Sequence, residues 1–295
     1  MPALVLAILL VSYGTVAPSM QPVSAQDNPD EGWAVIMEML QYPEGWTDLP
    51  TGHADSTKWN NTLHSLGWAT DHIRIINEAI TESSMLNALE WLREKADDND
   101  VVVFFVFAHG SWLKDVIGNG VLVGQTWELI PAARKLMAFS TCNAGELLSG
   151  IPGDNPEVRV GSVGRDELAW AGGTDEGLPV LGDVFNHFFT SAFMNETADT
   201  DGNGDVCAEE AFAFASPKSQ EYIQQVVFPA FPEYEELCNG TAPEPVMMDL
   251  YGGNLSLQCT QAESPSMNPY LVSGGVVAVL LAALVIIYYW RREHQ

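Results

Sequence analysis

The amino-acid sequence predicts an α/β fold in which helices cover both faces of a mostly parallel sheet. Short apolar runs alternate with segments that have a helical spacing of apolar residues, in the order strand, helix, strand, helix, strand. Two of these runs, 101–108 and 135–141, have a continuous apolar core, as in strands that are buried on both faces. With 47% hydrophobic residues, the 295-residue chain can fill a substantial core.

The first half of the predicted domain alternates strands and helices. In chain order we expect a strand over 33–40, a helix over 54–66, a short strand over 73–76 and a helix over 83–96. Asp55 or Ser56 is expected near the start of the first helix, because both residue types cap helices well. One face of the second helix carries Met85, Leu86, Leu89 and Leu92. The polar segment 97–100 then turns the chain into the strand at 101–108.

The second half continues the same alternation. Asn119-Gly120 predicts a hairpin, which is followed by a short helix near Trp127 and by the strand at 135–141. Further on we expect a helix from about Ala144, a strand over 158–163 and a helix over 181–193. The segment from 238 to 268 is rich in Pro, Gly, Ser and Asn and has little periodicity, so it is expected to be a stalk.

The charge of the chain limits the classes of partner. Twelve basic residues stand against 39 acidic ones, which gives a formal net charge of -27. This charge argues against nucleic acid and suits cationic peptides or divalent metals, although a solvated acidic surface explains most of it.

Both ends of the chain carry membrane signals. Residues 4–12 are a short apolar core and Val23-Ser24-Ala25 is a small-x-small cleavage site, so 1–25 is predicted to be a signal peptide. Residues 271–290 contain no charge, end in an aromatic belt and precede Arg291-Arg292, which predicts a transmembrane helix. The expected order is therefore a signal peptide (1–25), an ectodomain (26–237), a stalk (238–269), a transmembrane helix (270–290) and a cytoplasmic tail (291–295). This is the arrangement of a single-pass type I protein of the cell membrane, with its domain outside the cell or in a lumen.

Four cysteines are distributed unevenly along the chain. Cys142 ends a predicted strand, whereas Cys207, Cys238 and Cys259 lie in the second half of the ectodomain. An oxidising compartment makes one disulfide plausible, and Cys238 with Cys259 is the favoured pair, but spacing alone leaves the connectivity open.

Each of the two long apolar runs ends in a reactive side chain, His109 or Cys142. In open α/β sheets the ligand crevice lies at the carboxyl ends of the strands, so we expect both side chains in it. A Cys-His pair beside an exposed glycine backbone suffices for acyl transfer, and a following helix is expected to lower the pKa of Cys142. Taken alone, Cys142 is best interpreted as a small core residue and His109 as a histidine with ordinary hydrogen-bond partners at a strand end. Together, at the ends of two apolar runs, the two residues favour catalysis.

These motifs resemble those of the caspase-like cysteine peptidases, in particular the branch of the legumains and the glycosylphosphatidylinositol transamidase. The resemblance rests on His109-Gly110 and Cys142-Asn-Ala-Gly145, each after an apolar strand, and covers about residues 32–195. Weaker similarities in the same order are His53-Ala54-Asp55, Gly164 to Glu167, and Leu181-Gly182-Asp183. The resemblance implies a caspase-like three-layer α/β/α sandwich.

The resemblance also implies roles for individual residues. Cys142 would be the nucleophile, His109 the acid for the leaving group, and the N–H groups of Gly110 and Cys142 the oxyanion hole. Asp183 would lie at the floor of the specificity pocket, but Ser140 and Thr51 replace an acidic residue and an arginine of the legumain pocket. A lone aspartate favours Arg or Lys before the cleaved bond, by charge pairing. An ordinary helix N-cap is an equally good interpretation of Asp183.

Residues 199–210 follow the register of an EF-hand calcium loop, with oxygen ligands at loop positions one, three and five, glycine at six and Glu at twelve. The predicted side-chain ligands are Asp199, Asp201, Asn203 and Glu210. Asp205 is expected to ligate through its carbonyl, and water to replace the thiol of Cys207. A single such loop predicts a structural Ca²⁺ site. The alternative is a solvated acidic turn.

The sequence thus predicts a membrane-anchored, extracytoplasmic cysteine endopeptidase that acts on a peptide or protein substrate. Two alternatives stay open: a transamidase or peptide ligase that uses the same residues, and an inactive caspase-like surface binding module. The oligomeric state is not predicted.

Overall fold

The computed structural model describes residues 30–153 and 155–259. The predicted signal peptide (1–25), transmembrane helix (270–290) and cytoplasmic tail (291–295) lie outside these residues. Within the described ranges, no helix combines the length and the apolar character that a membrane span requires.

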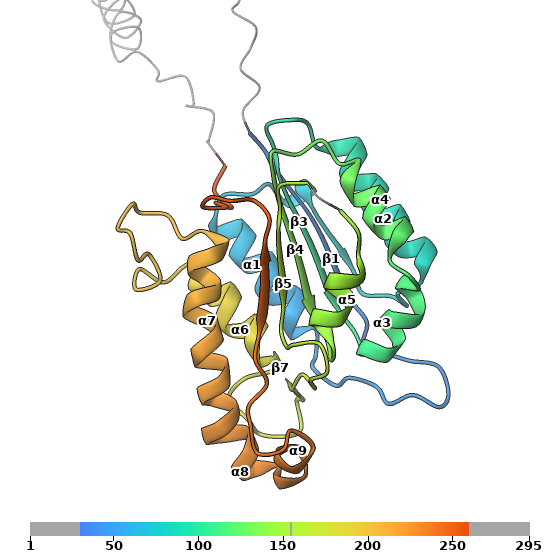
Figure 1. Cartoon of the computed structure of the whole chain (residues 1–295), viewed down its shortest axis with the longest axis vertical. Coiled ribbons are helices and arrows are strands. Elements are labelled where there is room, and N and C mark those ends of the chain that lie inside the picture. Colours follow the sequence, from blue (N-terminus) through green and yellow to red (C-terminus); the bar gives the residue numbers. More distant parts are fainter. Residues whose placement is uncertain (1–29, 154, 260–295) are drawn as a thin grey trace, which may run out of the picture.

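A six-stranded sheet forms the centre of the molecule, in the order β2-β1-β3-β4-β5-β8 (Figure 1). The strands are β1 (Gly32–Glu38), β2 (Ile73–Ile76), β3 (Val101–Phe107), β4 (Arg134–Ser140), β5 (Val158–Gly161) and β8 (Val246–Asp249). All pairs are parallel except β5 with β8, which is antiparallel. Two short strands, β6 (Ala171–Gly172) and β7 (Gly182–Asp183), form a separate antiparallel pair. The mostly parallel sheet of the predicted α/β fold is therefore confirmed.

Helices cover both faces of this sheet (Figure 1). One face packs against α2 (Glu82–Lys95), α3 (Gly110–Ile117), α4 (Val121–Glu128) and α5 (Ala144–Gly150). The other packs against α1 (Ala54–Ser65), α6 (Val184–Ala192) and α7 (Ala208–Tyr222). The remaining helical turns are a 3₁₀ turn (Thr70–His72), a π-helical turn (Ile223–Val227), α8 (Phe228–Ala230) and α9 (Pro232–Leu237).

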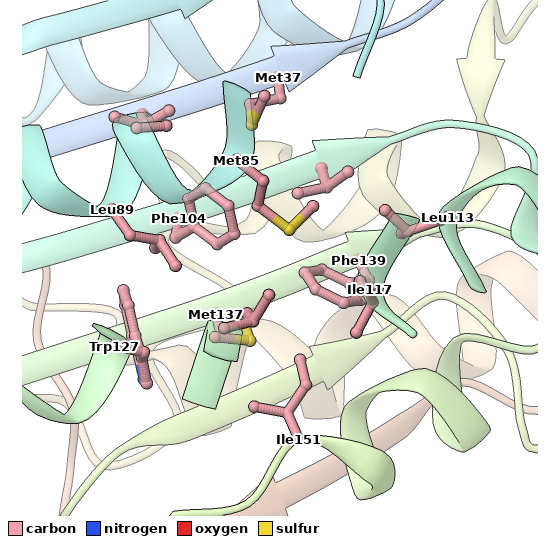
Figure 2. Packing of buried hydrophobic residues seen from close by; sticks show 14 of the residues in the cluster. Met37, Met85, Leu89, Phe104, Leu113, Ile117, Trp127, Met137, Phe139 and Ile151 are labelled. Carbon is pink, nitrogen blue, oxygen red and sulfur yellow. The ribbon is translucent and has the colours of Figure 1, made fainter. Parts of the chain in front are cut away.

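The central strands are apolar on both faces because each face has its own core. Odd-numbered residues of β1 and β4 and even-numbered residues of β3 point to one core, and their neighbours point to the other. Figure 2 shows Phe104, Met137 and Phe139 of the sheet against Met85 of α2 and Leu113 of α3. Burying one such side chain stabilises the fold by about 1.5–3 kcal/mol, so the sheet and its helices form one packed unit.

The hairpin predicted at Asn119-Gly120 is wrong. Residues 118–120 instead join two short helices, α3 and α4. Gly118 and Gly120 have φ angles of 59° and 72°, and a Cβ on Gly120 would lie 2.6 Å from the carbonyl oxygen of Gly150. The Asn-Gly signal identified a left-handed turn correctly, but the apolar residues around it pack as helices on the sheet.

The stalk predicted at 238–269 is wrong for its described part, 238–259. Strand β8 pairs with β5, and the side chains of Leu255 and Leu257 are completely buried in the core. The indole N–H of Trp68 also donates a hydrogen bond to the carbonyl of Leu257, at 2.9 Å. The segment lacks helical periodicity because it runs over the sheet as a short edge strand and an extended return.

The favoured Cys238–Cys259 disulfide is absent, and all four cysteines are free. Cys238 packs with the cluster around Tyr234 and Phe228, whereas Cys259 packs with the core beneath α1 and α7. The fold therefore places the two thiols in different clusters, which spacing along the chain does not reveal.

Candidate active site

The register of the sheet brings the two predicted catalytic side chains to one edge. Phe107 of β3 pairs with Ser140 of β4, and each strand is followed two residues later by His109 or Cys142. His109 is the N-cap of α3, and Cys142 precedes α5. Both line one cavity of about 290 Å³, together with Ser140 and Asp183.

The ring of His109 is held on one side by a backbone carbonyl. Its Nε2 lies 2.7 Å from the carbonyl oxygen of Thr47, and its backbone N–H donates to the hydroxyl of Tyr42 at 2.8 Å. The rings of Tyr42 and Trp46 pack beside it, with centroids at 4.7 and 5.9 Å. Because a carbonyl only accepts, Nε2 carries the proton and Nδ1 is left as the basic nitrogen.

Sequence reasoning did not find Thr47 as the group that orients His109. The interaction uses a main-chain carbonyl in the loop between β1 and α1, and a backbone group carries no residue-type signal. Only the path of the loop places this carbonyl next to the ring.

The thiol of Cys142 is half-buried, and its nearest hydrogen-bonding group is the carbonyl of Ala169, at 4.0 Å from Sγ. Burial raises the pKa of Cys142, and the charge of Asp183 raises it further. The expected lowering of this pKa by the following helix is wrong, because loss of hydration outweighs the field of the seven-residue α5. Because its pKa is raised, the resting thiol is protonated. In the described residues no hydrogen bond joins Cys142 to His109.

The backbone of Gly110 lies directly against that of Cys142. A Cβ on Gly110 would be 2.1 Å from the carbonyl oxygen of Cys142, so this approach requires glycine. Among the described residues, neither the N–H of Gly110 nor that of Cys142 donates a hydrogen bond to another residue. The N–H groups of Gly110 and Cys142 therefore lie beside the thiol, and neither is used by another residue of the described structure.

Asp183 lines the cavity and also caps a helix. Its carboxylate accepts the N–H of Asn186 at 2.7 Å, at the start of α6, and the side chain is 1% exposed. Burial and the neighbouring carboxylate of Asp55 raise the pKa of Asp183 to about 7. Asp55 in turn accepts the backbone N–H of Asp183 at 3.0 Å and the side-chain amide of Asn186 at 2.7 Å. The helix N-cap interpretation of Asp183 is therefore confirmed, whereas its role in a specificity pocket stays a prediction.

Ser140 and Thr51, which replace legumain pocket residues, occupy different environments. Ser140 lines the cavity and is 3% exposed. Thr51 is buried beside Glu38, with its hydroxyl 3.5 Å from the carboxylate, and does not line the cavity.

Three further cavity residues, Trp170, Glu176 and Tyr234, were not predicted from the sequence. Glu176 accepts the N–H of Gly173 at 3.0 Å, and Tyr234 donates to the carbonyl of Leu168 at 2.8 Å. The indole N–H of Trp170 is buried without a partner in the described structure. They come from loops and from α9, where no periodicity marks them. Apart from His109, the described residues around the cavity include no basic side chain, whereas two are acidic.

Comparisons with known proteins agree on the fold. The Caspase domain family model matches residues 31–153, from β1 to just beyond α5, a stretch that includes His109 and Cys142. The chain is also similar to the crystal structure of caspase-1 from Spodoptera frugiperda, with a TM-score of 0.53 and 13% sequence identity; the match covers 79% of this chain and 92% of that chain. This chain has a caspase-like fold. No curated protein sequence matches it.

The caspase-like fold confirms the broader resemblance seen in the sequence. The similarity to caspase-1, at 13% identity, concerns the fold alone. The narrower assignment to the legumain and transamidase branch stays a prediction.

The predicted calcium loop lies outside the matched residues, between α6 and α7. Carboxylate oxygens of Asp199, Asp201 and Glu210 all lie within 4.8 Å of one another. Asp199 accepts the N–H groups of Gly202 and Gly204, at 2.7 and 2.9 Å, so the loop wraps around this carboxylate.

Loop positions five, seven and nine are also defined. Asn203 bonds the side chain of Asp201 at 3.0 Å and accepts the N–H of Asp205 at 2.7 Å. One carboxylate oxygen of Asp205 is buried without a partner in the described structure. Cys207 is the N-cap of α7, where its sulfur accepts the N–H of Glu210 at 3.4 Å.

Glu210, at loop position twelve, is ionised. Burial acts to raise the pKa of its carboxyl group, but hydrogen bonds from Thr200, Cys207 and Asp201 hold the pKa at about 2. The loop therefore presents a fixed negative charge next to Asp199 and Asp201.

Proposed function

We propose that this protein is a cysteine endopeptidase that acts through a thioacyl intermediate on Cys142. The observation that supports this most directly is the orientation of His109. Its Nε2 is held by the carbonyl of Thr47, 2.7 Å away, so Nδ1 is the nitrogen that can exchange a proton in the cavity lined by Cys142.

The reaction would begin with a proton transfer. The thiol of Cys142 gives its proton to Nδ1 of His109, and the thiolate forms a bond to the carbonyl carbon of the substrate. The N–H groups of Gly110 and Cys142 stabilise the oxyanion. When the C–N bond breaks, His109 gives the proton to the departing amine. Water then gives a proton to His109 and attacks the carbonyl carbon of the thioester. The C–S bond breaks, and His109 returns the proton to the sulfur, which regenerates the thiol and the neutral histidine.

The raised pKa of Cys142 makes this proton transfer necessary. A thiol with a lowered pKa would already be ionised, whereas here burial and Asp183 oppose ionisation. A substrate that brings a positive charge to Asp183 would offset that negative charge and favour the thiolate.

We further propose that the enzyme prefers Arg or Lys before the cleaved bond. Asp183 and Glu176 are the acidic groups of the cavity, and among the described residues His109 is the one basic side chain that lines it. A guanidinium or ammonium would pair with Asp183 and hold it ionised. Asparagine preference, as in legumains, is the competing outcome.

The test uses the full-length protein in detergent with calcium, and fluorogenic amides that carry Arg, Lys, Asn or Asp before the bond. We expect cleavage of the Arg and Lys amides, and at least a thousandfold loss of kcat/KM in Cys142→Ala. Cys238→Ala, which removes another half-buried free thiol, serves as the matched control. If the purified protein cleaves none of these amides and an active-site thiol reagent does not label Cys142, the binding-module alternative is favoured.

The same intermediate can be passed to an amine instead of water. The rings of Tyr42 and Trp46 pack beside His109, so an organic amine that approaches this histidine would meet an aromatic surface. Adding a peptide amine to the assay and measuring the ratio of ligated to hydrolysed product distinguishes a ligase from a peptidase.

We also propose that residues 199–210 hold a structural Ca²⁺ ion. Asp199, Asp201, Asn203 and Glu210 would bind it by side chain and Asp205 by its carbonyl. The proximity of three carboxylates and the low pKa of Glu210 support this proposal. A bound divalent cation would neutralise the repulsion between these groups.

A type I membrane location is proposed from the sequence alone. It rests on the apolar segments 4–12 and 271–290 and on Arg291-Arg292. Alkaline carbonate extraction of membranes, with protease protection of the ectodomain, tests both the anchoring and the orientation. Release of the intact chain by carbonate would contradict it.

A further inference from the structure

A second hollow lies beside His109 and is not used by the reaction described above. It is a groove of about 380 Å³, here called the tryptophan groove. Its walls include Trp46, Ile80, Glu82, Trp112, Asp115 and Val116. None of these residues lines the cavity that contains Cys142 and Asp183.

The tryptophan groove is built from the elements that position His109. Trp112 lies on α3, three residues after His109, and its indole N–H donates to the carbonyl of Ile80 at 2.9 Å. Trp46 precedes Thr47, whose carbonyl holds the His109 ring. The two indoles meet edge to face with centroids 5.3 Å apart, and Trp46 lies 5.9 Å from the His109 ring. The groove and His109 therefore share a wall.

The tryptophan groove combines apolar walls with negative charge. Trp46 is 37% exposed, so a large apolar surface faces solvent there. Glu82 and Asp115 are exposed, and within the ranges that the structure describes neither forms an ion pair. Nearby Lys114 is already paired with Glu146, at 2.8 Å. A complementary ligand is thus apolar with an adjacent positive charge.

The position relative to His109 indicates which part of a substrate reaches the groove. In the proposed reaction His109 gives its proton to the departing amine, so the chain after the cleaved bond leaves alongside its ring. The residue before the bond occupies the other cavity, with Asp183. The tryptophan groove lies on the His109 side, where the Trp46 ring that lines it packs beside the His109 ring.

We propose that the tryptophan groove binds the leaving-side segment of the substrate, with an aromatic residue against Trp46 and Trp112 and an adjacent Lys or Arg beside Glu82 and Asp115. This inference rests on the proposed peptidase function and extends it, because it assigns the specificity for residues after the cleaved bond. Aromatic edge-to-face contacts and cation–carboxylate pairing supply the recognition.

The test compares substrates that share the residue before the bond. Internally quenched peptides carry Phe-Lys, Phe-Glu or Gly-Gly after the cleaved bond. Each pair is placed either at the first and second positions after the bond or at the second and third. A coumarin amide, which has no peptide after the bond, is the reference substrate. We expect the full-length protein to cleave the best Phe-Lys peptide with a kcat/KM on the order of tenfold above that for Gly-Gly. The kcat/KM for the Phe-Glu peptide should be lower than that for the Phe-Lys peptide.

Two surface variants test the location. Asp115→Lys reverses a charge on the rim, and Val116→Lys places a charge on the apolar wall. Both variants should lose most of the difference in kcat/KM between the Phe-Lys and Gly-Gly peptides, while their kcat/KM for the coumarin amide stays that of the wild type. The control Glu94→Lys, on the exposed face of α2, should change neither value. Equal cleavage of Phe-Lys and Gly-Gly peptides, or the same loss on the coumarin amide, would overturn the assignment.

The coumarin amide separates this proposal from the one on which it rests. If the wild-type protein does not cleave it, the peptidase function fails and the groove loses its assigned ligand. If the protein cleaves it without any preference after the bond, the peptidase function stands and only the groove assignment fails.

Discussion

At the scale of single residues, Asp183 connects the fold to the proposed chemistry. It caps α6 through the N–H of Asn186 and lines the cavity that contains Cys142. Because it is almost completely buried and faces Asp55, its ionised form is disfavoured. In its ionised form the carboxylate to which we assign the cationic residue of the substrate therefore destabilises the free protein.

The stability of the fold should show this cost. The pKa of Asp183 is raised from 3.8 in the unfolded chain to about 7 in the folded protein. The stability that the protonated carboxyl group gives the fold is therefore fully present below pH 4 and is lost as pH rises through 7. Asp183→Asn keeps a helix cap without the charge. We expect the free energy of unfolding of Asp183→Asn, relative to that of the wild type, to rise by a few kcal/mol between pH 4 and pH 8. Urea unfolding measures this difference. Asp175→Asn, at an exposed position nearby, is the control; a pH-independent difference would contradict the argument.

The thiol of Cys142 should report the same charge. Burial and Asp183 raise its pKa, so alkylation by iodoacetamide should have a midpoint above about pH 8.5, the value of an ordinary cysteine. In Asp183→Asn the midpoint should move to lower pH, because a negative neighbour is removed. Mass spectrometry of the Cys142 peptide measures both rates. An unchanged midpoint would show that burial alone sets the pKa.

At the scale of elements, the start of α1 depends on a residue from β1. The N-cap, His53, has a φ of 59° and forms no side-chain cap. The buried carboxylate of Glu38 instead accepts the N–H of Ser56 at 3.1 Å and that of Asp55 at 3.4 Å. The strand thus caps the helix that carries Asp55, and Asp55 holds the segment that contains Asp183.

Replacing Glu38 should destabilise the fold and disturb the cavity together. Glu38→Leu leaves the N–H groups of α1 without an acceptor, at about 1–3 kcal/mol for each unsatisfied group. Glu38→Gln keeps one acceptor oxygen and should lose less stability than Glu38→Leu. Thermal unfolding measures the loss of stability, and kcat/KM for an Arg amide measures the disturbance of the cavity. Equal stability of the Leu and Gln variants would argue against a capping role.

At the scale of the whole molecule, the loop 199–210 joins the helices to the end of the described chain. Asn254 bonds the side chain of Asp201 at 3.3 Å, and Glu209 accepts the N–H of Leu255 at 2.9 Å. Leu255 and Leu257 then enter the core beside α1 and α7. An ion in this loop would therefore hold α7 and the C-terminal return together.

Calcium should accordingly raise the melting temperature of the full-length protein. Binding only to the folded state at a hundred times Kd adds about 2.7 kcal/mol. Glu210→Gln should remove the rise, whereas Glu94→Gln, on the exposed face of α2, should keep it. Calorimetry with and without a chelator makes the measurement. The same melting temperature in both conditions would falsify the calcium proposal.

The sequence by itself determined much of the architecture and of the candidate site. Short apolar runs predicted the strands and a helical spacing of apolar residues predicted most helices, since burial on one or two faces dictates where apolar residues stand. His109 and Cys142 were identified because each ends an apolar run, and parallel strands in register carry such ends to one edge.

Only the tertiary structure decided the rest, because those features depend on which segments meet in space. The carbonyl of Thr47 that holds His109 and the cavity residue Glu176 come from loops without periodicity. Tyr234 of α9 and the tryptophan groove depend on how helices and loops pack together. The antiparallel strand β8 looked like a stalk because its four residues gain their structure from pairing with β5. The pKa of Cys142 likewise follows from burial and from Asp183, far away in the sequence, and not from the adjacent helix.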